Sequence, residues 1–332
     1  MTLLLYLLLL LASVVITLGG CTLFTNAIEW LGKRLKVSEG AVGSVFAAVG
    51  TTLPETSIPV VAIFFGEGRE RTDVGLGAIL GAPFMLSTLV LPILAGLLLL
   101  YARLGGRPPA FALDYRDVRF DLRFFLIAYG LAVTLAFVPS RPAHSGAALL
   151  LIALYGYYVY CKLAGQPGAG AEIEPLIFSR KAVRPSYGVI AVQAVTGLAG
   201  LVTGAHLFVT AAMALASALG VSPLVLALLI APLATELPEM SNSFLWLYKR
   251  KDTLAVGNVT GAMVFQGTFP VSVGLIGTDW QLAPAALATM GLALLAVGFS
   301  LGQLLWGGHW RPWLVGGHAV LYLGYGVYLY AF

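Results

Sequence analysis

One short motif occurs twice in this chain, each time inside an apolar stretch. Its copies are Thr51-Thr52-Leu53-Pro54-Glu55 and Thr235-Glu236-Leu237-Pro238-Glu239. The similarity extends well beyond the motif, because Gly20–Ser57 aligns without a gap on Gly204–Ser241. Leu and Ala match by chance in apolar sequence, but a shared Thr-x-Leu-Pro-Glu does not. The chain is therefore expected to contain two copies of one structural unit.

The composition places both copies in a membrane. Of the 332 residues 59% are hydrophobic and only 10% are charged, and the mean hydropathy is +0.91. Soluble domains carry roughly 25% charged residues. A membrane-spanning helix needs about 20 apolar residues, so this length accommodates roughly ten spans joined by short loops. The net charge of +4 contains no long basic run, which argues against a nucleic-acid partner.

The apolar segments predict an all-α membrane protein with about ten transmembrane helices. All but three of the 19 basic residues then fall in loops on one side, and the positive-inside rule assigns that side to the cytoplasm. The three exceptions are Arg69, Arg71 and Arg141. Both termini are then extracytoplasmic, and we expect the protein in the cell (inner) membrane. The expected helices span 3–32, 39–65, 74–101, 122–138, 145–162, 186–218, 223–247, 254–276, 282–304 and 312–331.

The domain organisation follows from the repeat. We expect residues 1–165 to form the first repeat of five transmembrane helices and 186–332 the second, with 166–185 as a cytoplasmic linker loop. Because five is an odd number, the second copy lies upside down in the membrane. Inverted repeats whose broken helices meet near the midplane are typical of secondary transporters.

The paired glutamates indicate a cation site. A charge at the bilayer centre costs at least ~3 kcal/mol on insertion scales and is tolerated in a bundle interior with a partner. Pro54 and Pro238 have no N–H, so the carbonyls of Gly50 and Ala234 lose their helical partners. Carboxylate, hydroxyl and carbonyl oxygens together are ligands for hard cations such as Ca²⁺. Protonated structural glutamates and simple proline kinks are the alternatives, although no Lys or Arg lies in the facing apolar stretches.

The two motifs resemble the paired G-T-S-L-P-E motifs of the cation/calcium exchanger superfamily, in its sodium/calcium exchanger branch. The stretch Gly200–Val209 is similar to that family's span before the second motif. The resemblance covers most of the chain. It implies a secondary active cation antiporter with Na⁺ and Ca²⁺ ligands at the motif positions. Carried over residue by residue, these ligands are Thr51, Thr52, Glu55, Thr235 and Glu239.

The sequence also departs from the family pattern. The span after each motif has Ala82 and Leu86, or Ala262 and Gln266, where the family has Ser and Asn or Asp. Glu236 stands in place of a motif Ser. We expect Glu55, Glu236 and Glu239 to converge, and burial and like charge then favour holding at least one proton near neutral pH when the site is empty.

Three functions remain open at this stage. Sodium/calcium exchange by alternating access at a midplane carboxylate site is the first. Antiport of the same fold coupled to H⁺, or of another cation, is the second, and a membrane protein that binds cations without transporting them is the third. The sequence predicts no enzyme and no cofactor beyond transported Ca²⁺ with Na⁺ or H⁺. Its expected partners are inorganic cations and the lipid bilayer, with the oligomeric state left open. The candidate cation ligands are Gly50, Thr51, Thr52, Glu55, Ala234, Thr235, Glu236, Glu239 and Gln266.

Overall fold

The computed structural model describes residues 3–35, 47–105, 107–113, 115–164, 174–182 and 184–331, and this part of the chain contains helices and no β-strand. The first half contains α1 (Leu3–Arg34), α3 (Ala47–Phe64), α4 (Arg69–Met85), the π-helix η2 (Leu86–Val90), α5 (Leu91–Arg103), α6 (Tyr115–Leu135), α7 (Arg141–Ala164) and the 3₁₀ turn η3 (Ile177–Ser179). The second half contains α8 (Tyr187–Leu219), α9 (Pro223–Thr235), α10 (Leu237–Tyr248), α11 (Asp252–Gln266), α12 (Phe269–Gly277), α13 (Pro284–Trp306), α14 (Pro312–Gly316) and α15 (Ala319–Ala331).

The all-helical class is confirmed, and each of the ten expected segments is helical over most of its described part. Within the described part of the chain, six helices are long and apolar enough to cross a membrane: Leu3–Arg34, Arg69–Arg103, Arg141–Lys162, Tyr187–Leu219, Asp252–Gly277 and Pro284–Trp306. The other four expected spans, and the inverted arrangement of the repeats, remain predictions. The largest shift is in the helix expected at 122–138, which begins at Tyr115 and ends at Leu135. Residues 39–46 of the second expected helix lie outside the described part.

The described residues form two compact units, each drawing on both halves of the sequence. One unit combines Met1–Val74 with Gly156–Pro223, and the other combines Gly75–Tyr155 with Leu224–Phe332. The first therefore contains α1, α3, η3 and α8. The second contains α5, α6 and α9 to α15, with most of α4 and α7.

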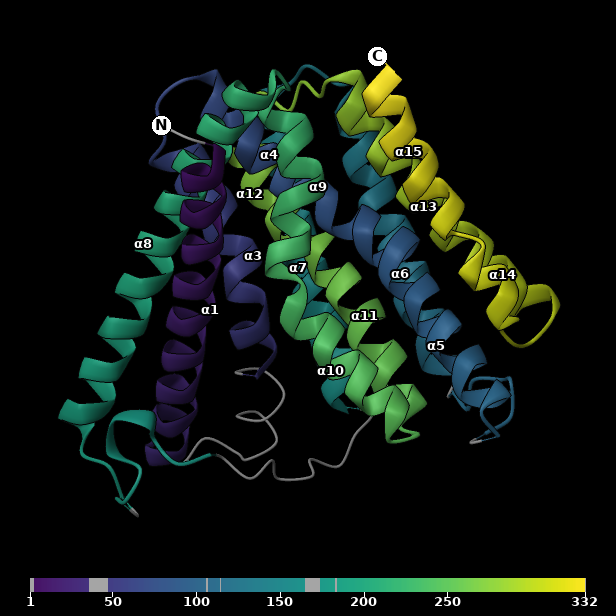
Figure 1. The fold of residues 1–332 in the computed structure, drawn as a ribbon, viewed down its shortest axis with the longest axis horizontal. Coiled ribbons are helices and arrows are strands. Elements are labelled where there is room, and N and C mark those ends of the chain that lie inside the picture. Colours follow the sequence, from purple (N-terminus) through teal and green to yellow (C-terminus); the bar gives the residue numbers. More distant parts are fainter. Residues whose placement is uncertain are drawn as a thin grey trace. The chain divides into compact units, whose positions relative to one another are not determined.

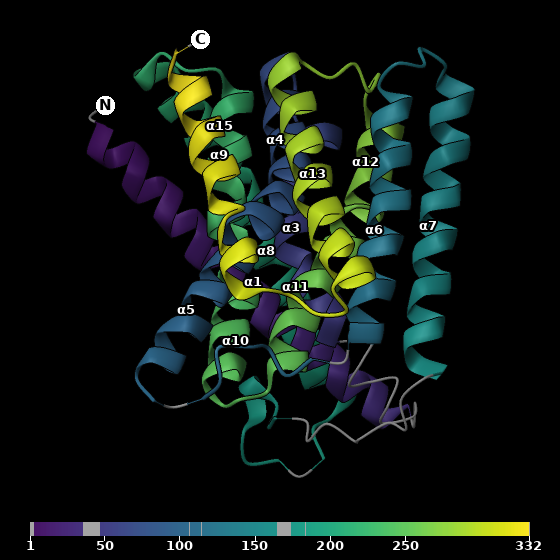
Figure 2. The same cartoon turned by 90° about the vertical axis from the view of Figure 1, so that its right-hand side faces the viewer.

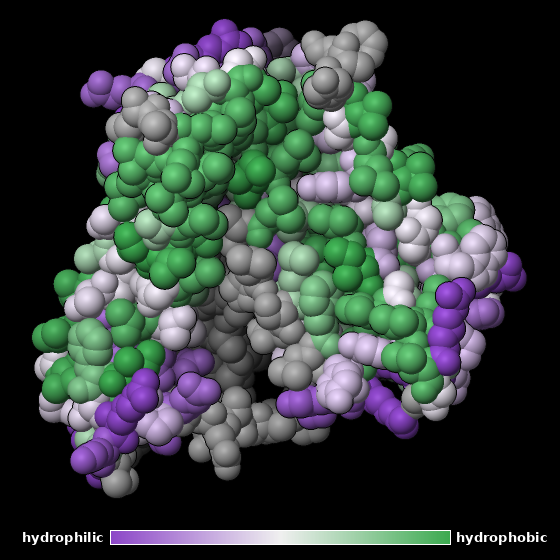
Figure 3. All heavy atoms as spheres, in the orientation of Figure 1, coloured by the Kyte–Doolittle hydropathy of each residue, from purple (hydrophilic) through white to green (hydrophobic). Residues whose placement is uncertain are grey.

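In the first unit α1 and α8 pack side by side along much of their length (Figure 1). Glycines allow their backbones to touch. A Cβ added to Gly20 would lie 2.5 Å from Leu201 N, and one added to Gly197 would lie 2.5 Å from Phe24 N. Small residues permit such close approach between membrane helices, where no hydrophobic effect drives association. These helices lie along the left of Figure 3, where the upper part of the surface is mostly hydrophobic, as expected of a lipid-facing side, and the lower end carries hydrophilic patches.

Polar side chains tie α1, α8 and the linker together within the same unit. Gln193 Nε2 donates to Leu23 O at 3.0 Å and to Asn26 Oδ1 at 2.9 Å. The linker joins through its backbone, because Asn26 Oδ1 accepts from Ile177 N at 3.1 Å. Trp30 Nε1 donates to the carbonyl of Glu174 at 2.9 Å. The linker also contacts α8, because Phe178 N donates to Gln193 Oε1 at 2.8 Å.

In the second unit α6 packs against α13 (Figure 2) and against α11. Thr260 of α11 donates to Asp121 of α6 at 2.7 Å, with both side chains buried. At the start of α11, Asp252 forms a buried ion pair with Arg107 and accepts from Ala112 N at 2.9 Å. These contacts position α11, the helix that lies against the candidate site.

Candidate cation site

The second copy of the motif lies where α9 and α10 are interrupted. The interruption falls at Glu236, between Thr235, the last residue of α9, and Leu237, the first of α10. Pro238 has no N–H, so it cannot continue the α9 hydrogen-bond pattern to the carbonyl of Ala234. A helix that should run from 223 to 247 is therefore broken at the motif, as the sequence predicts.

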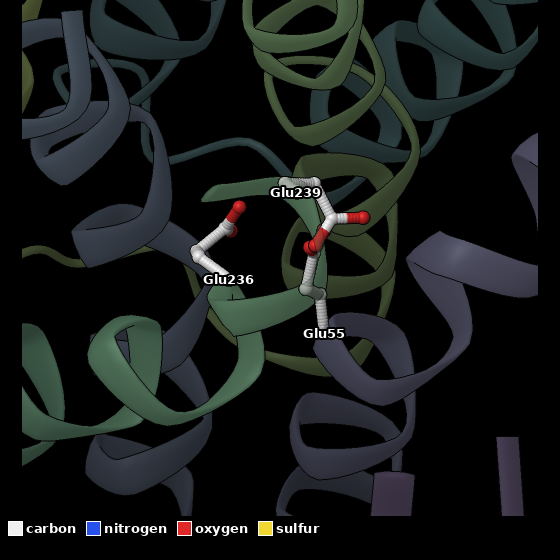
Figure 4. Close-up of side chains that lie close together, drawn as sticks. All are labelled: Glu55, Glu236 and Glu239. Carbon is white, nitrogen blue, oxygen red and sulfur yellow. The ribbon is translucent and has the colours of Figure 1, made fainter. Parts of the chain in front are cut away.

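Two acidic side chains meet at this break. Glu236 and Glu239 are 0% and 2% exposed, and one carboxylate oxygen of each lies within 4.8 Å of the other. Figure 4 shows both side chains beside the interruption, with Glu239 in the first turn of α10. Two buried carboxylates at this separation repel each other strongly in a low-dielectric site. A bound cation or a proton relieves that repulsion, so the pair is suited to cation binding.

Thr235 completes the described oxygens of this motif. Its side chain is buried, and its hydroxyl donates to the carbonyl of Ala231 at 3.1 Å. A hydroxyl oxygen that donates one hydrogen bond still has lone pairs to offer a cation. The side chain of Ala234 lies outside the described part of the chain.

Gln266, the last residue of α11, is brought directly to the motif. Its Nε2 donates to Oε1 of Glu236, and both side chains are buried. The sequence placed Gln266 among the cation ligands, which requires its amide oxygen. In the structure its amide nitrogen faces the Glu236 carboxylate, and its role as a cation ligand stays a prediction.

Asn258 is a residue at this site that the ligand prediction did not include. Its Nδ2 donates to the carbonyl of Glu239 at 3.1 Å and to Ser243 Oγ at 3.0 Å. The sequence signal was Gly257-Asn258, a part of the family pattern that the chain keeps. Its contact with α10 depends on how α10 packs on α11, which a single sequence does not show.

The first copy of the motif lies in α3. Glu55 is 5% exposed, so this carboxylate is also buried (labelled in Figure 4). Gly50, Thr51 and Thr52 belong to the same helix, but the side chains of Thr51 and Thr52 lie outside what the structure describes. Their roles as ligands stay predictions.

Other hydroxyls near the broken helices are engaged by backbone carbonyls. Ser87 donates to Pro83 O at 2.8 Å, and Thr88 donates to Phe84 O at 2.5 Å within the π-helical segment. Thr268 donates to Val264 O at 2.8 Å. These three hydroxyls therefore bond to backbone carbonyls one turn earlier in the chain.

Comparisons with known proteins agree with the resemblance seen in the motifs. The sequence model of the family described as "Sodium/calcium exchanger protein" matches residues 5–164 and 189–332. The chain is 27% identical over 305 residues to "Putative antiporter CaxA" of Alkalimonas amylolytica, covering 89% of this chain and 90% of that one. It is 24% identical over 268 residues to "Inner membrane protein YrbG" of Escherichia coli, covering 80% and 78%.

Two solved structures share the fold. The crystal structure of the "H+/Ca2+ Exchanger CAX" superposes with a TM-score of 0.70 at 17% identity, covering 98% of this chain and 81% of that one. A structure of the sodium-calcium exchanger NCX_Mj superposes with a TM-score of 0.55 at 20% identity, covering 97% of each chain. At these identities the likeness establishes the fold.

Proposed function

The chain belongs to the sodium/calcium exchanger protein family, and from this premise we propose that it exchanges Ca²⁺ for Na⁺ across the cell (inner) membrane. The observation that carries the proposal is the buried carboxylate pair, Glu236 and Glu239, at the interruption of an apolar helix. Two negative charges in such a place favour a divalent cation, because its charge balances theirs.

The proposed Ca²⁺ site draws on both copies of the motif. Ca²⁺ takes about six to eight oxygen ligands. The second copy offers the carboxylates of Glu236 and Glu239, the hydroxyl of Thr235 and the carbonyl of Ala234. We assign the remaining ligands to the first copy, which repeats the same residue types in sequence. These are the carboxylate of Glu55, the hydroxyls of Thr51 and Thr52 and the carbonyl of Gly50.

Antiport follows when one site serves both ions. Two inverted repeats allow the site to open to one side of the membrane and then to the other, by rearrangement of one part against the rest. Na⁺ and Ca²⁺ both prefer oxygen ligands, so they compete for the same carboxylates. Net exchange results if the empty protein reorients slowly and the loaded protein reorients quickly.

A proton is the second candidate for the counter-ion. The observation that favours it is Glu236, a second carboxylate within 4.8 Å of Glu239 where the family motif has a neutral Ser. Like charge and burial favour protonation of one member of such a pair. A divalent cation that displaces this proton would drive H⁺ out of the site, which is a route to proton coupling.

Flux of radioactive Ca²⁺ into proteoliposomes tests these alternatives. An imposed outward Na⁺ gradient should accelerate uptake, whereas dependence on an outward H⁺ gradient alone would favour the second candidate. Glu55→Gln and Glu239→Gln should each abolish flux while the protein still inserts. Wild-type flux in either variant would contradict the proposed site. Ca²⁺ binding without flux under any gradient would identify a binding protein that does not transport.

A further inference from the structure

Two side chains of α11 hold the α9–α10 interruption from one side. Asn258 donates one amide group to two acceptors of α10, the Glu239 carbonyl at 3.1 Å and Ser243 Oγ at 3.0 Å. Eight residues further along α11, Gln266 donates to the Glu236 carboxylate. One helix, α11, therefore holds both the backbone of Glu239 and the carboxylate of Glu236.

These hydrogen bonds act on different parts of the pair. Asn258 joins acceptors in successive turns of α10, so it restrains the first turn, from which the Glu239 side chain projects. Gln266 restrains the rotamer of Glu236 directly, in a site where the donor is 1% and the acceptor 0% exposed. A hydrogen bond to a charged group is stronger in such a low-dielectric place than in water.

We call the hydrogen bonds from Asn258 and Gln266 to α10 and Glu236 the brace. It belongs to the second copy alone. In the register that places Gly77-x3-Gly81 on Gly257-x3-Gly261, the residues equivalent to Asn258 and Gln266 are Ala78 and Leu86. Neither apolar side chain can donate a hydrogen bond. The two copies are therefore unequal, and the second alone has this polar brace from the helix that follows its motif.

We propose that Asn258 and Gln266 are positioning residues that set the cation affinity of the site by fixing the α9–α10 interruption in its binding geometry. This inference rests on the proposed function and names which residues tune its site. Ligands held in place before binding need little reordering when the cation arrives, and loss of such supporting residues typically lowers metal affinity about 10- to 100-fold.

Two variants test the brace. Gln266→Met keeps the length and volume of the side chain but removes the donor, and Asn258→Leu does the same at the other position. Each should raise the Ca²⁺ concentration for half-maximal flux by about tenfold or more. Maximal flux at saturating Ca²⁺ should change much less, because the carboxylates themselves remain. If Asn258→Leu fails to accumulate, Ser243→Ala provides a second test. It removes an acceptor of the same amide and should also raise the Ca²⁺ concentration for half-maximal flux.

Thr260→Val is the matched control on the same helix. It also removes a buried hydrogen bond of α11, but its partner is Asp121 of α6, at 2.7 Å, and not the interruption. It should leave the half-saturating Ca²⁺ concentration unchanged even if it lowers thermal stability. An equal rise of the half-saturating Ca²⁺ concentration in this control would show that any loss of packing on α11 weakens Ca²⁺ binding. The brace would then be rejected.

A double-mutant cycle separates positioning from direct ligation. If Gln266 acts through Glu236, Gln266→Met should have little further effect in a Glu236→Ala background. An undiminished effect in that background would make Gln266 a direct ligand and overturn its positioning role. The Glu239→Gln variant separates failure of the brace from failure of the proposed function. If it is inactive while Asn258→Leu and Gln266→Met both show the wild-type Ca²⁺ concentration for half-maximal flux, the brace is wrong and the proposed function stands. If Glu239→Gln transports normally, the proposed function itself fails.

Discussion

At the scale of single residues, Glu236 carries the largest chemical difference between the two copies. Its counterpart in the first copy is Thr52, and it adds a buried carboxylate to a helix break that already contains Glu239. Gln266, at the position where the family has an Asn or Asp, donates to it. An acidic residue is thus present on the broken helix at position 236 and absent from position 266 of α11, so the site keeps a carboxylate in an altered place.

The Glu236→Ser variant tests what this altered place does. If the pair holds a proton when empty, wild-type transport should rise with pH over the range in which that proton is lost, since Ca²⁺ competes with it. Removing one carboxylate lowers the mutual repulsion, so the variant should show a flatter pH profile or a stronger Na⁺ dependence. Initial Ca²⁺ flux across a pH series, with and without a Na⁺ gradient, measures both. Unchanged profiles would place Glu236 outside the ion site.

At the scale of helices, the sequence predicted the broken α9–α10 element better than its surroundings. The proline and the glutamate are local signals, because a missing N–H acts on its own helix. The start of α6 was misplaced because Arg116, Asp117 and Arg119 look like loop residues, although a helix end at the membrane surface can carry them. Asn258 escaped the ligand prediction for another reason. Gly257-Asn258 belongs to the family pattern, but the contact of Asn258 with α10 depends on tertiary packing of α11 against α10, which a single sequence does not show.

Two ion pairs of the second unit allow a matched prediction about helix ends. Arg107 and Asp252 have side chains that are 7% and 0% exposed, whereas Arg141 and Asp279 are 58% and 71% exposed. Removing one partner of a buried pair leaves an uncompensated charge and costs roughly 3–5 kcal/mol. An exposed pair contributes about 0–1 kcal/mol. Arg107→Met should therefore lower the thermal unfolding temperature in detergent far more than Arg141→Met. Equal shifts of the unfolding temperature in the two variants would contradict a stabilising buried ion pair between Arg107 and Asp252 of α11.

The packing of α1 on α8 gives a second prediction at this scale. Adding a Cβ to Gly20 would bring it to 2.5 Å from Leu201 N, whereas nothing lies within 4 Å of the position it would take on Gly19. Overpacking of this kind typically costs about 1–3 kcal/mol. Gly20→Ala should lower thermal stability in detergent, while its neighbour Gly19→Ala should be neutral. A neutral Gly20→Ala variant would mean that the two helices are not in backbone contact.

At the scale of the whole molecule, the compact units do not coincide with the sequence halves. One unit takes α1 and α3 from the first half and α8 from the second, and the other takes most of the remaining helical residues from both. Equivalent first helices of the two expected repeats, α1 and α8, thus pack together in one unit. Two copies of one design that are related by symmetry would pair their first helices in this way, and that symmetry remains a prediction. Whether that symmetry inverts the copy depends on topology, because only an odd number of spans per repeat turns it over.

Topology is therefore the decisive property to measure. The distribution of basic residues, with only Arg69, Arg71 and Arg141 outside the predicted cytoplasmic loops, predicts both termini outside and the linker 166–185 inside. A periplasm-active reporter fused after Phe332 should be active, and a cytoplasm-active reporter fused there should be silent. The same two reporters inserted in the linker should give the opposite result, because five spans separate each terminus from it. A cytoplasmic C-terminus together with a cytoplasmic linker would mean an even number of spans in the second repeat. The two copies would then have the same orientation, and alternating access through inverted repeats would have to be abandoned for this protein.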